Sequence, residues 1–330
     1  MNLRDDKSLP PTPDWLALIT ILVGGGTCAL LVYNAPLLGH DWMVGFVRQT
    51  FDYQYPPWVT LILRPLTSLP PRIGLAVMNG LTLSSVAVLS YRYARHTFPA
   101  SYAPAILALL FALFNPIPWM ILWLGQIEVM VLLGLAILPV GIPLLFAKPH
   151  LGLWAGLGSR RDLVWMTIML VISLVMWGIW PVSLLSQTLG YRVPHPTAMG
   201  WSTLHPVIGV VGLVLLLFTT RDPLRLIAAG SFVSPFLMPY HYYILLPALG
   251  RTRGYRQLAL WFASQWMIVV AGMPIIPIKM VALVFPLLVW ATLAPTLRPR
   301  AMLADPDLFL NRIRATVRQA RLWLARPRLV

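Results

Sequence analysis

Residues 73–93 read IGLAVMNGLTLSSVAVLSYRY, and this stretch decides the fold class. Its single formal charge is Arg92 near the end, and Arg95 and His96 follow it. A helix needs roughly 20 predominantly apolar residues to cross the hydrocarbon core of a bilayer. Basic residues collect on the cytoplasmic side of such spans. The stretch therefore predicts a membrane-spanning helix that ends inside the cell.

The composition of the whole chain indicates the same environment. Of its 330 residues 58% are hydrophobic and 11% are charged, and the mean hydropathy is +0.75. A soluble domain carries roughly 25% charged residues, so this excess of apolar surface is typical of a chain embedded in lipid. The lone Cys28 excludes an intramolecular disulfide and a cysteine-rich metal site. The net charge of +15 lies mainly in short loops and in the C-terminal tail, so we predict no nucleic-acid partner.

The basic loops predict a multi-pass protein of the cell membrane with both termini in the cytoplasm. Residues 1–13 form a cytoplasmic N-terminal segment, and the first span covers about residues 14–34. Residues 35–71 then form an outer loop. The transmembrane domain as a whole covers residues 14–297, and we expect 8 to 10 spans within it.

Two regions are predicted to be broken or re-entrant rather than simple spans. Residues 119–157 are interrupted by prolines, and residues 226–249 begin and end beside basic clusters that belong inside the cell. Proline removes a helix hydrogen bond and kinks or ends the helix. Broken backbone at membrane depth needs protein or a water-filled cavity to satisfy it. The predicted fold class is thus an all-α polytopic transmembrane helical bundle with broken or re-entrant segments.

Residues 298–330 form a separate basic tail. Asp305-Pro306 is a favourable helix start, and apolar residues follow it at helical spacing with arginines on the other sides. This pattern predicts an amphipathic helix on the cytoplasmic surface, with anionic inner-leaflet lipids as its partners. A solvated, partly disordered tail is the alternative.

The candidate functional residues are the few polar side chains in this apolar chain. Ionisable groups at membrane depth are costly to bury, and they commonly mark functional sites. Asp41 and Asp52 lie in the outer loop, and Glu128 is the only glutamate of the chain. Most of the candidate polar residues lie in four short segments: Asp41-Trp42 … Tyr55-Pro56-Pro57 … Pro65-Leu66 … Leu69-Pro70; Gly125-Gln126-Ile127-Glu128; Ala147-Lys148-Pro149-His150; and Ser234-Pro235 … His241-Tyr242 … Leu245-Leu246-Pro247.

In this order the four segments resemble the "D…YPP…PL..LP", "GQ-x-N", "KP" and "SP…HY…LLP" segments of the glycosyltransferase 87 family. The resemblance covers about residues 15–295 and implies the GT-C fold and the use of a polyprenol-phosphate-mannose donor. The chain departs from the family in three ways. It is shorter, it has Glu128 in place of Asn, and it has Met238-Pro239-Tyr240 in place of an aromatic-aspartate pair.

The resemblance implies an inverting glycosyltransferase whose active site faces the extracytoplasmic side. It would move a sugar, mannose or an arabinose-like sugar, from a polyprenyl phosphate to a glycolipid, glycan or protein acceptor. Asp41 would be the general base that takes the proton of the acceptor hydroxyl. The leaving phosphate needs positive charge and hydrogen-bond donors. We expect no metal and no cofactor beyond the lipid-linked donor substrate. The residues expected to bind phosphate or substrate are Lys148, His241, Arg64, Gln126, Tyr55, Tyr53 and Asp52.

Other interpretations of the same residues stay open at this point. Asp41 could cap the helix that follows it, and Asp52 could be a solvated loop charge. Glu128 could serve only to pair with Lys148, and His241 could be a satisfied core histidine. For the whole chain the alternatives are a transporter or lipid flippase that uses Glu128, Lys148 and His241 as a charge relay, and a non-catalytic scaffold derived from the enzyme.

Overall fold

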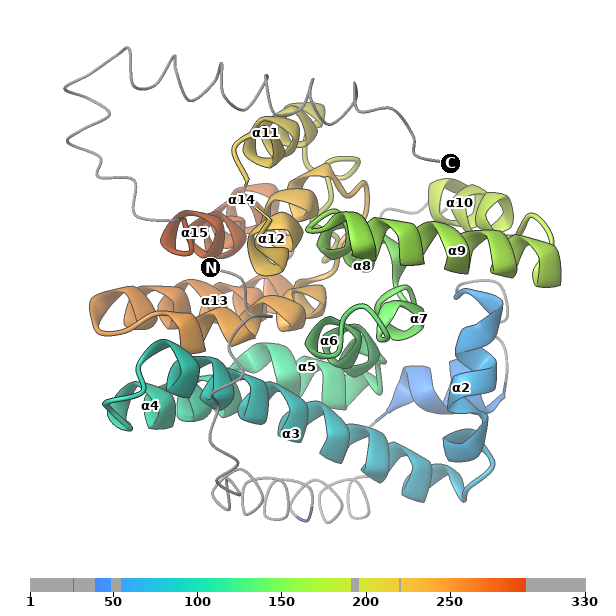
Figure 1. The fold of residues 1–330 in the computed structure, drawn as a ribbon, viewed down its shortest axis with the longest axis horizontal. Helices are drawn as coiled ribbons and strands as arrows, with labels where there is room; N and C mark the ends of the chain where they lie inside the picture. The colour runs from blue at the N-terminus through green and yellow to red at the C-terminus, as the bar shows by residue number, and fades with distance from the viewer. Residues whose placement is uncertain (1–25, 27–38, 49–54, 191–195, 220, 295–330) are drawn as a thin grey trace.

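The structure is a computed structural model that describes residues 26, 39–48, 55–190, 196–219 and 221–294 (Figure 1). The N-terminal segment, the first predicted span, Asp52, Tyr53 and the C-terminal tail lie outside these residues. Within them the chain is all-helical, which confirms the all-α class. In chain order the elements are η1 (Trp42–Val47), α2 (Pro57–Thr67), α3 (Pro71–Thr97), α4 (Ala103–Leu113), α5 (Pro116–Leu124), α6 (Glu128–Ala136), α7 (Ile142–Leu145), α8 (Pro149–Gly156), α9 (Arg160–Trp177), α10 (Trp180–Gly190), α11 (Pro206–Leu217), α12 (Pro223–Val233), η2 (Pro239–Arg251), α13 (Tyr255–Gly272), α14 (Ile276–Ala282) and α15 (Val284–Thr292).

Among the described residues, two stretches are long and apolar enough to cross a membrane, judged by length and composition alone. The first is α3, which contains the stretch predicted from residues 73–93, and the second is Ala103–Leu124, which α4 and α5 form together. Shorter apolar helices include α11, α12 and Ile276–Thr292. The predicted number of 8 to 10 spans therefore stays a prediction.

Proline stands at the start of many of these helices and helps to divide the apolar sequence into short helices. Its fixed φ and its missing N–H suit the first helical position, where that N–H has no intrahelical partner. The apolar stretch Ala103–Leu124 is accordingly divided before Pro116, and the Asn115 side chain caps α5 by accepting a hydrogen bond from the Ile117 N–H. The helices that begin with proline are α2, α3, α5, α8, α11, α12 and η2.

The two regions predicted to be broken are broken in the structure. Residues 119–157 hold the end of α5 and the short helices α6, α7 and α8, and residues 226–249 hold most of α12 and most of η2. Between the latter two helices, residues 234–238 are not helical. The sequence thus predicted the interruptions correctly.

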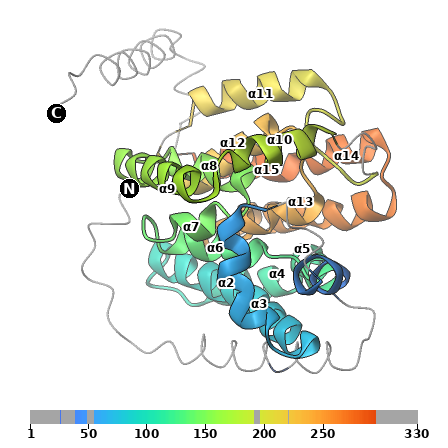
Figure 2. The same ribbon diagram turned by 90° about the vertical axis from the view of Figure 1, so that its right-hand side faces the viewer.

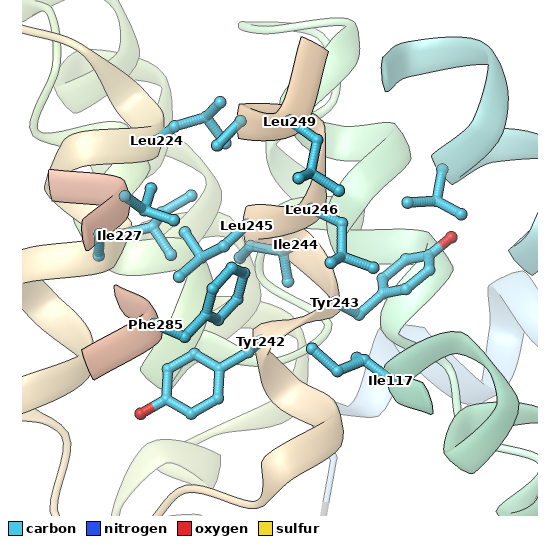
Figure 3. Close-up of a cluster of buried hydrophobic side chains, with 14 of the residues drawn as sticks. Ile117, Leu224, Ile227, Tyr242, Tyr243, Ile244, Leu245, Leu246, Leu249 and Phe285 are labelled. Carbon is cyan, nitrogen blue, oxygen red and sulfur yellow. The ribbon is translucent and has the colours of Figure 1, made fainter. Parts of the chain in front are cut away.

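The centre of the molecule is η2, a 3₁₀ helix of 13 residues. Runs of 3₁₀ helix beyond three or four residues are uncommon because the hydrogen-bond geometry is poor, so this one depends on its neighbours. Leu245, Leu246 and Leu249 of η2 pack into a buried cluster with Phe285 and Ile117 (Figure 3). The approach to α3 is especially close, since a Cβ on Gly250 would lie 2.0 Å from the carbonyl oxygen of Ser90.

The helices stack around this centre (Figures 1 and 2). Helices α3 and α4 lie on one side of the molecule and α11 on the opposite side, with α13 and α12 between them. The outer surface of α9 is apolar at helical spacing, and its exposed large side chains include Val164, Ile168, Val171 and Val175. Contiguous apolar surface of this kind marks a face that meets a partner or a membrane.

Candidate functional site

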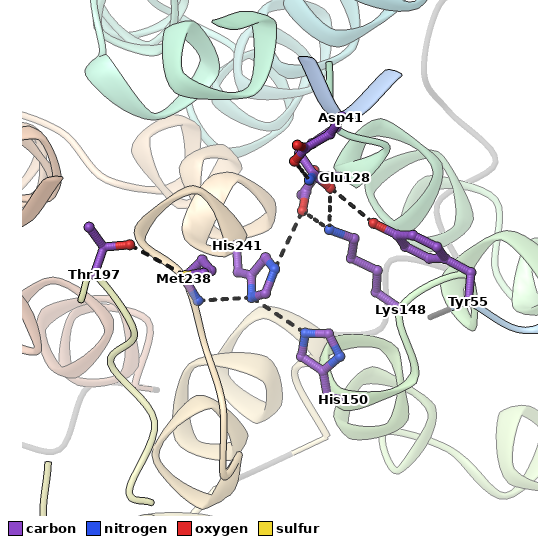
Figure 4. A network of polar contacts seen from close by, with 9 residues as sticks. Asp41, Tyr55, Glu128, Lys148, His150, Thr197, Met238 and His241 are labelled. Carbon is purple, nitrogen blue, oxygen red and sulfur yellow. Dashed lines mark hydrogen bonds and ion pairs between the residues drawn. The ribbon is translucent and has the colours of Figure 1, made fainter. Parts of the chain in front are cut away.

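The candidate site is a cluster of polar side chains from five segments that are distant in sequence (Figure 4). The cluster lies where the start of η1, the loop before α2, the starts of α6 and α8, and the first turn of η2 meet. Its members are Asp41, Tyr55, Gln126, Glu128, Lys148, His150 and His241. We refer to these seven residues as the polar cluster.

Asp41 directly precedes η1 but does not act as a helix cap. Its carboxylate makes no capping hydrogen bond to the helix. Instead Oδ2 accepts a hydrogen bond from the Gln126 amide, and Oδ1 lies 3.1 Å from Nδ1 of the exposed His40. The Asp41 side chain is 19% exposed. A carboxylate that is held from one side and open on the other can still exchange a proton with a bound molecule.

Close backbone packing brings Asp41 to Gln126. The Gly39 N–H donates to the carbonyl oxygen of Trp123 at 2.8 Å, which joins this segment to the end of α5. Gly125 then ends α5 in the left-handed conformation, with φ +74°. Trp42, the residue after Asp41, is fully buried. Its Nε1 donates to the carbonyl oxygen of Pro71 at 3.1 Å, which anchors this segment against α3.

We predict that Gly125→Ala displaces Asp41 and destabilises the fold. A Cβ at this position would lie 2.7 Å from Cβ of Trp42 and 2.9 Å from Cα of Gly39, and the residue has a positive φ. Backbone strain and crowding together are expected to lower the free energy of unfolding by about 2–4 kcal/mol. Denaturant or thermal unfolding in detergent measures this loss.

The control is Gly272→Ala at the end of α13, where a Cβ would meet nothing within 4 Å. This variant should stay within about 0.5 kcal/mol of the wild type. Equal stability of the two variants would contradict the importance of the approach at Gly125.

Gln126 connects the open and the buried parts of the polar cluster. Its Nε2 donates to Asp41, while its Oε1 accepts from the Tyr55 hydroxyl at 3.1 Å and from Lys148 Nζ at 3.0 Å. Two donors on one side of the amide and a carboxylate on the other define its orientation. Gln126 therefore links the carboxylate of Asp41 to the ammonium of Lys148.

Tyr55 contributes a neutral donor from the loop that precedes α2. Burial raises the pKa of its phenol well above the usual range, and the negative charges of Glu128 and Asp41 raise it further. Desolvation and nearby negative charge both disfavour the phenolate. Tyr55 therefore keeps its proton and its hydrogen bond to Gln126 throughout the ordinary pH range.

Lys148 and Glu128 form a buried ion pair, which confirms the predicted pairing. Lys148 Nζ contacts Oε1 of Glu128, and the two side chains are 4% and 0% exposed. Glu128 is the first residue of α6, where the helix dipole favours a negative charge. Its second oxygen, Oε2, is buried and has no partner among the described residues. Lys148 has three N–H donors, and the described hydrogen bonds use two of them, to Gln126 and to Glu128.

The geometry around His241 assigns its protons. Its Nδ1 accepts a hydrogen bond from the Met238 N–H at 3.1 Å, so this nitrogen carries no proton. The neutral ring then has its proton on Nε2, which lies 3.6 Å from Oε1 of Glu128. Nε2 of His150 lies 3.4 Å from the same Nδ1. His241 is therefore uncharged.

The structure brings together five of the residues that the sequence singled out for a site: Asp41, Gln126, Tyr55, Lys148 and His241. Arg64 does not join them. It lies exposed near the end of α2, and no described contact connects it to the polar cluster. Asp52 and Tyr53 lie outside the described residues.

Two polar residues of the quoted segments, His150 and Tyr240, are not in the set expected to bind phosphate or substrate, yet the structure places both at the site. His150 contacts His241, and Tyr240 places its ring centroid 5.3 Å from Lys148 Nζ. Their positions within two residues of Lys148 and His241 are the sequence signal that pointed to them.

The arrangement offers groups suited to proton transfer and anion binding. Asp41 offers a partly exposed carboxylate as a base, and Lys148, on the other side of Gln126, has one N–H donor that the described hydrogen bonds do not use. Among the described residues no group of three or more His, Cys, Asp or Glu side chains could hold a metal ion. Comparisons with family models, with curated proteins and with solved structures find no match to this chain.

Proposed function

We propose that this chain is an integral membrane glycosyltransferase of the GT-C type. It transfers a sugar such as mannose from a polyprenyl phosphate to an acceptor hydroxyl on the extracytoplasmic face, with inversion. One observation carries the proposal: all four segments of the family resemblance contribute a side chain to the polar cluster. These side chains are Asp41 and Tyr55, Gln126, Lys148, and His241.

The shape of the molecule supports a membrane location for this activity. Trp42, next to Asp41, binds the first residue of α3, whereas Arg95 lies in its last turn. At 1.5 Å per residue, these ends of α3 are roughly 36 Å apart, compared with a hydrocarbon core of about 30 Å. The polar cluster and the basic end of α3 thus suit opposite surfaces of a bilayer. The apolar outer face of α9 suits contact with lipid, as in a multi-pass bundle.

In the proposed reaction the acceptor oxygen attacks the anomeric carbon of the donor sugar. Asp41 takes the proton of the acceptor hydroxyl as the new carbon–oxygen bond forms. The bond between the anomeric carbon and the phosphate oxygen breaks, and its electron pair leaves with the polyprenyl phosphate. The unused N–H of Lys148 stabilises the charge of that phosphate. Gln126 holds the Asp41 carboxylate in place.

The test is a transfer assay with membranes that contain the chain. The membranes are supplied with labelled polyprenyl-phosphate sugars, and transfer of label into lipid, glycan and protein fractions is measured. Label should appear in one acceptor fraction and be missing in membranes without the chain. The proposal is wrong if no donor in a panel of mannosyl and arabinosyl lipids gives transfer.

A second candidate function, transport with a proton relay, has one observation in its favour. Both Lys148 and His241 approach the same oxygen of Glu128, so the carboxylate can exchange partners. Uptake of a labelled substrate into sealed vesicles separates this function from sugar transfer, because transport leaves every covalent bond of the substrate intact.

A further inference from the structure

The polar cluster contains more negative than positive charge. Asp41 and Glu128 are its carboxylates, and Lys148 is its one ammonium group. His241 is neutral because its Nδ1 accepts the Met238 N–H. Arg64, the other candidate cation, has no described contact with the cluster. A site of this composition is unusual for a phosphate, which proteins commonly bind with several cationic donors.

Glu128 is the residue that offsets the positive charge of Lys148 in the site. Its Oε1 contacts Lys148 Nζ directly, and neither side chain is appreciably exposed. Oε2 is buried and unpartnered among the described residues, so its charge is not balanced by a second donor. Charge interactions in such a buried place are stronger than in water. A ligand beside Lys148 therefore experiences the charge of Glu128 as well.

The proposed substrate and product differ in charge. A polyprenyl-phosphate sugar is a phosphodiester with one negative charge. The released polyprenyl phosphate is a monoester, which carries a second negative charge above a pKa of about 6. A site whose single ammonium is partly neutralised by a carboxylate favours the singly charged ion over the doubly charged one.

We infer that Glu128 makes the site discriminate against doubly charged phosphate monoesters, and thereby promotes release of the lipid product. The inference rests on the proposed function and extends it to a specificity-determining residue. Glu128 acts through its charge on Lys148 and on the bound phosphate, and it forms no bond with the reacting atoms.

The first test uses the wild-type protein and two lipids that differ by one charge. Farnesyl phosphate and farnesyl methyl phosphate are titrated in detergent at pH 8 and pH 5, and their affinities are measured. At pH 8 the monoester should bind about tenfold more weakly than the diester. At pH 5, where both lipids carry one charge, the affinities should agree within about twofold.

The groups around Glu128 do not disturb this comparison. They are Lys148, His241, Asp41, Tyr55 and Tyr243. At each pH the two lipids meet the same protonation states of these groups. The ratio of the two affinities therefore reports the charge of the ligand.

The second test replaces the charge of Glu128 by Glu128→Gln. The amide oxygen can still accept from Lys148, while the negative charge is gone. At pH 8 the monoester should bind about tenfold more tightly than to the wild type, and the difference between the lipids should fall below about threefold. The matched control is Asp162→Asn, because Asp162 is a buried acid at the start of α9 that contacts Ser159. It should keep the wild-type ratio.

The outcomes distinguish a failure of the inference about Glu128 from a failure of the proposed glycosyltransferase function. If both lipids bind the wild type with equal affinity at pH 8, or if Glu128→Gln keeps the wild-type ratio, the inference about Glu128 is overturned and the proposed function stands. If neither lipid binds the wild type at all, the proposed function fails together with the inference. Should Glu128→Gln not fold, equal affinities of the two lipids for the wild type at pH 8 would still overturn the inference.

Discussion

Asp41→Asn is expected to lower the rate of sugar transfer about 100- to 10,000-fold at equal protein level. The amide cannot take a proton from the acceptor hydroxyl, whereas it keeps the size of the side chain and an oxygen that can accept from Gln126. Asp41 makes no capping hydrogen bond and is 19% exposed, so the stability of the fold should change little. Donor affinity, measured with a polyprenyl-phosphate sugar, should also stay within a fewfold of the wild type.

The control for this variant is again Asp162→Asn, which changes another aspartate outside the polar cluster. Transfer by this control should equal that of the wild type. If Asp41→Asn keeps a third or more of the wild-type rate, the base is another residue. If it loses donor binding together with transfer, Asp41 contributes to binding rather than to proton transfer.

The sequence predicted the helix class and the positions of interruption because both depend on local chemistry. A long apolar stretch such as residues 73–93 satisfies its backbone hydrogen bonds within itself when it forms a helix, and α3 covers it. Proline favours the first helical position because of its fixed φ and missing N–H, as at Pro116 and Pro239. The 3₁₀ geometry of η2 could not be predicted, because packing from all sides stabilises it rather than the preference of its residues.

The sequence could predict which residues form the candidate site, but it could not predict which hydrogen bonds they make with one another. Rare polar residues in an apolar chain tend to meet, because a buried polar group needs a partner. Asp41, Gln126 and Lys148 do so here. An Asp before a helix also suggests a cap, and only the fold decides between these roles. Because the backbone packs closely at Gly125, the carboxylate of Asp41 accepts a hydrogen bond from Gln126 and does not cap η1.

Lys148→Met is expected to have the largest effect on stability, a loss of about 3–5 kcal/mol in the free energy of unfolding. The variant leaves the carboxylate of Glu128 fully buried without its ammonium partner. His241 cannot replace it, since its Nε2 lies 3.6 Å from Oε1 and the ring is neutral. Breaking a buried ion pair by removing one partner is costly because the remaining charge stays desolvated.

Two further variants show whether the unpaired charge causes the loss. The double variant Lys148→Met with Glu128→Gln removes both charges and should recover all but about 1–2 kcal/mol. Lys279→Met changes a second largely buried lysine, in α14, which has no carboxylate partner among the described residues, and should cost less than about 1 kcal/mol. Chemical unfolding in detergent measures all four proteins. If the double variant is as unstable as Lys148→Met, the loss comes from packing around Lys148, and Glu128 is not held in the fold by its ion pair.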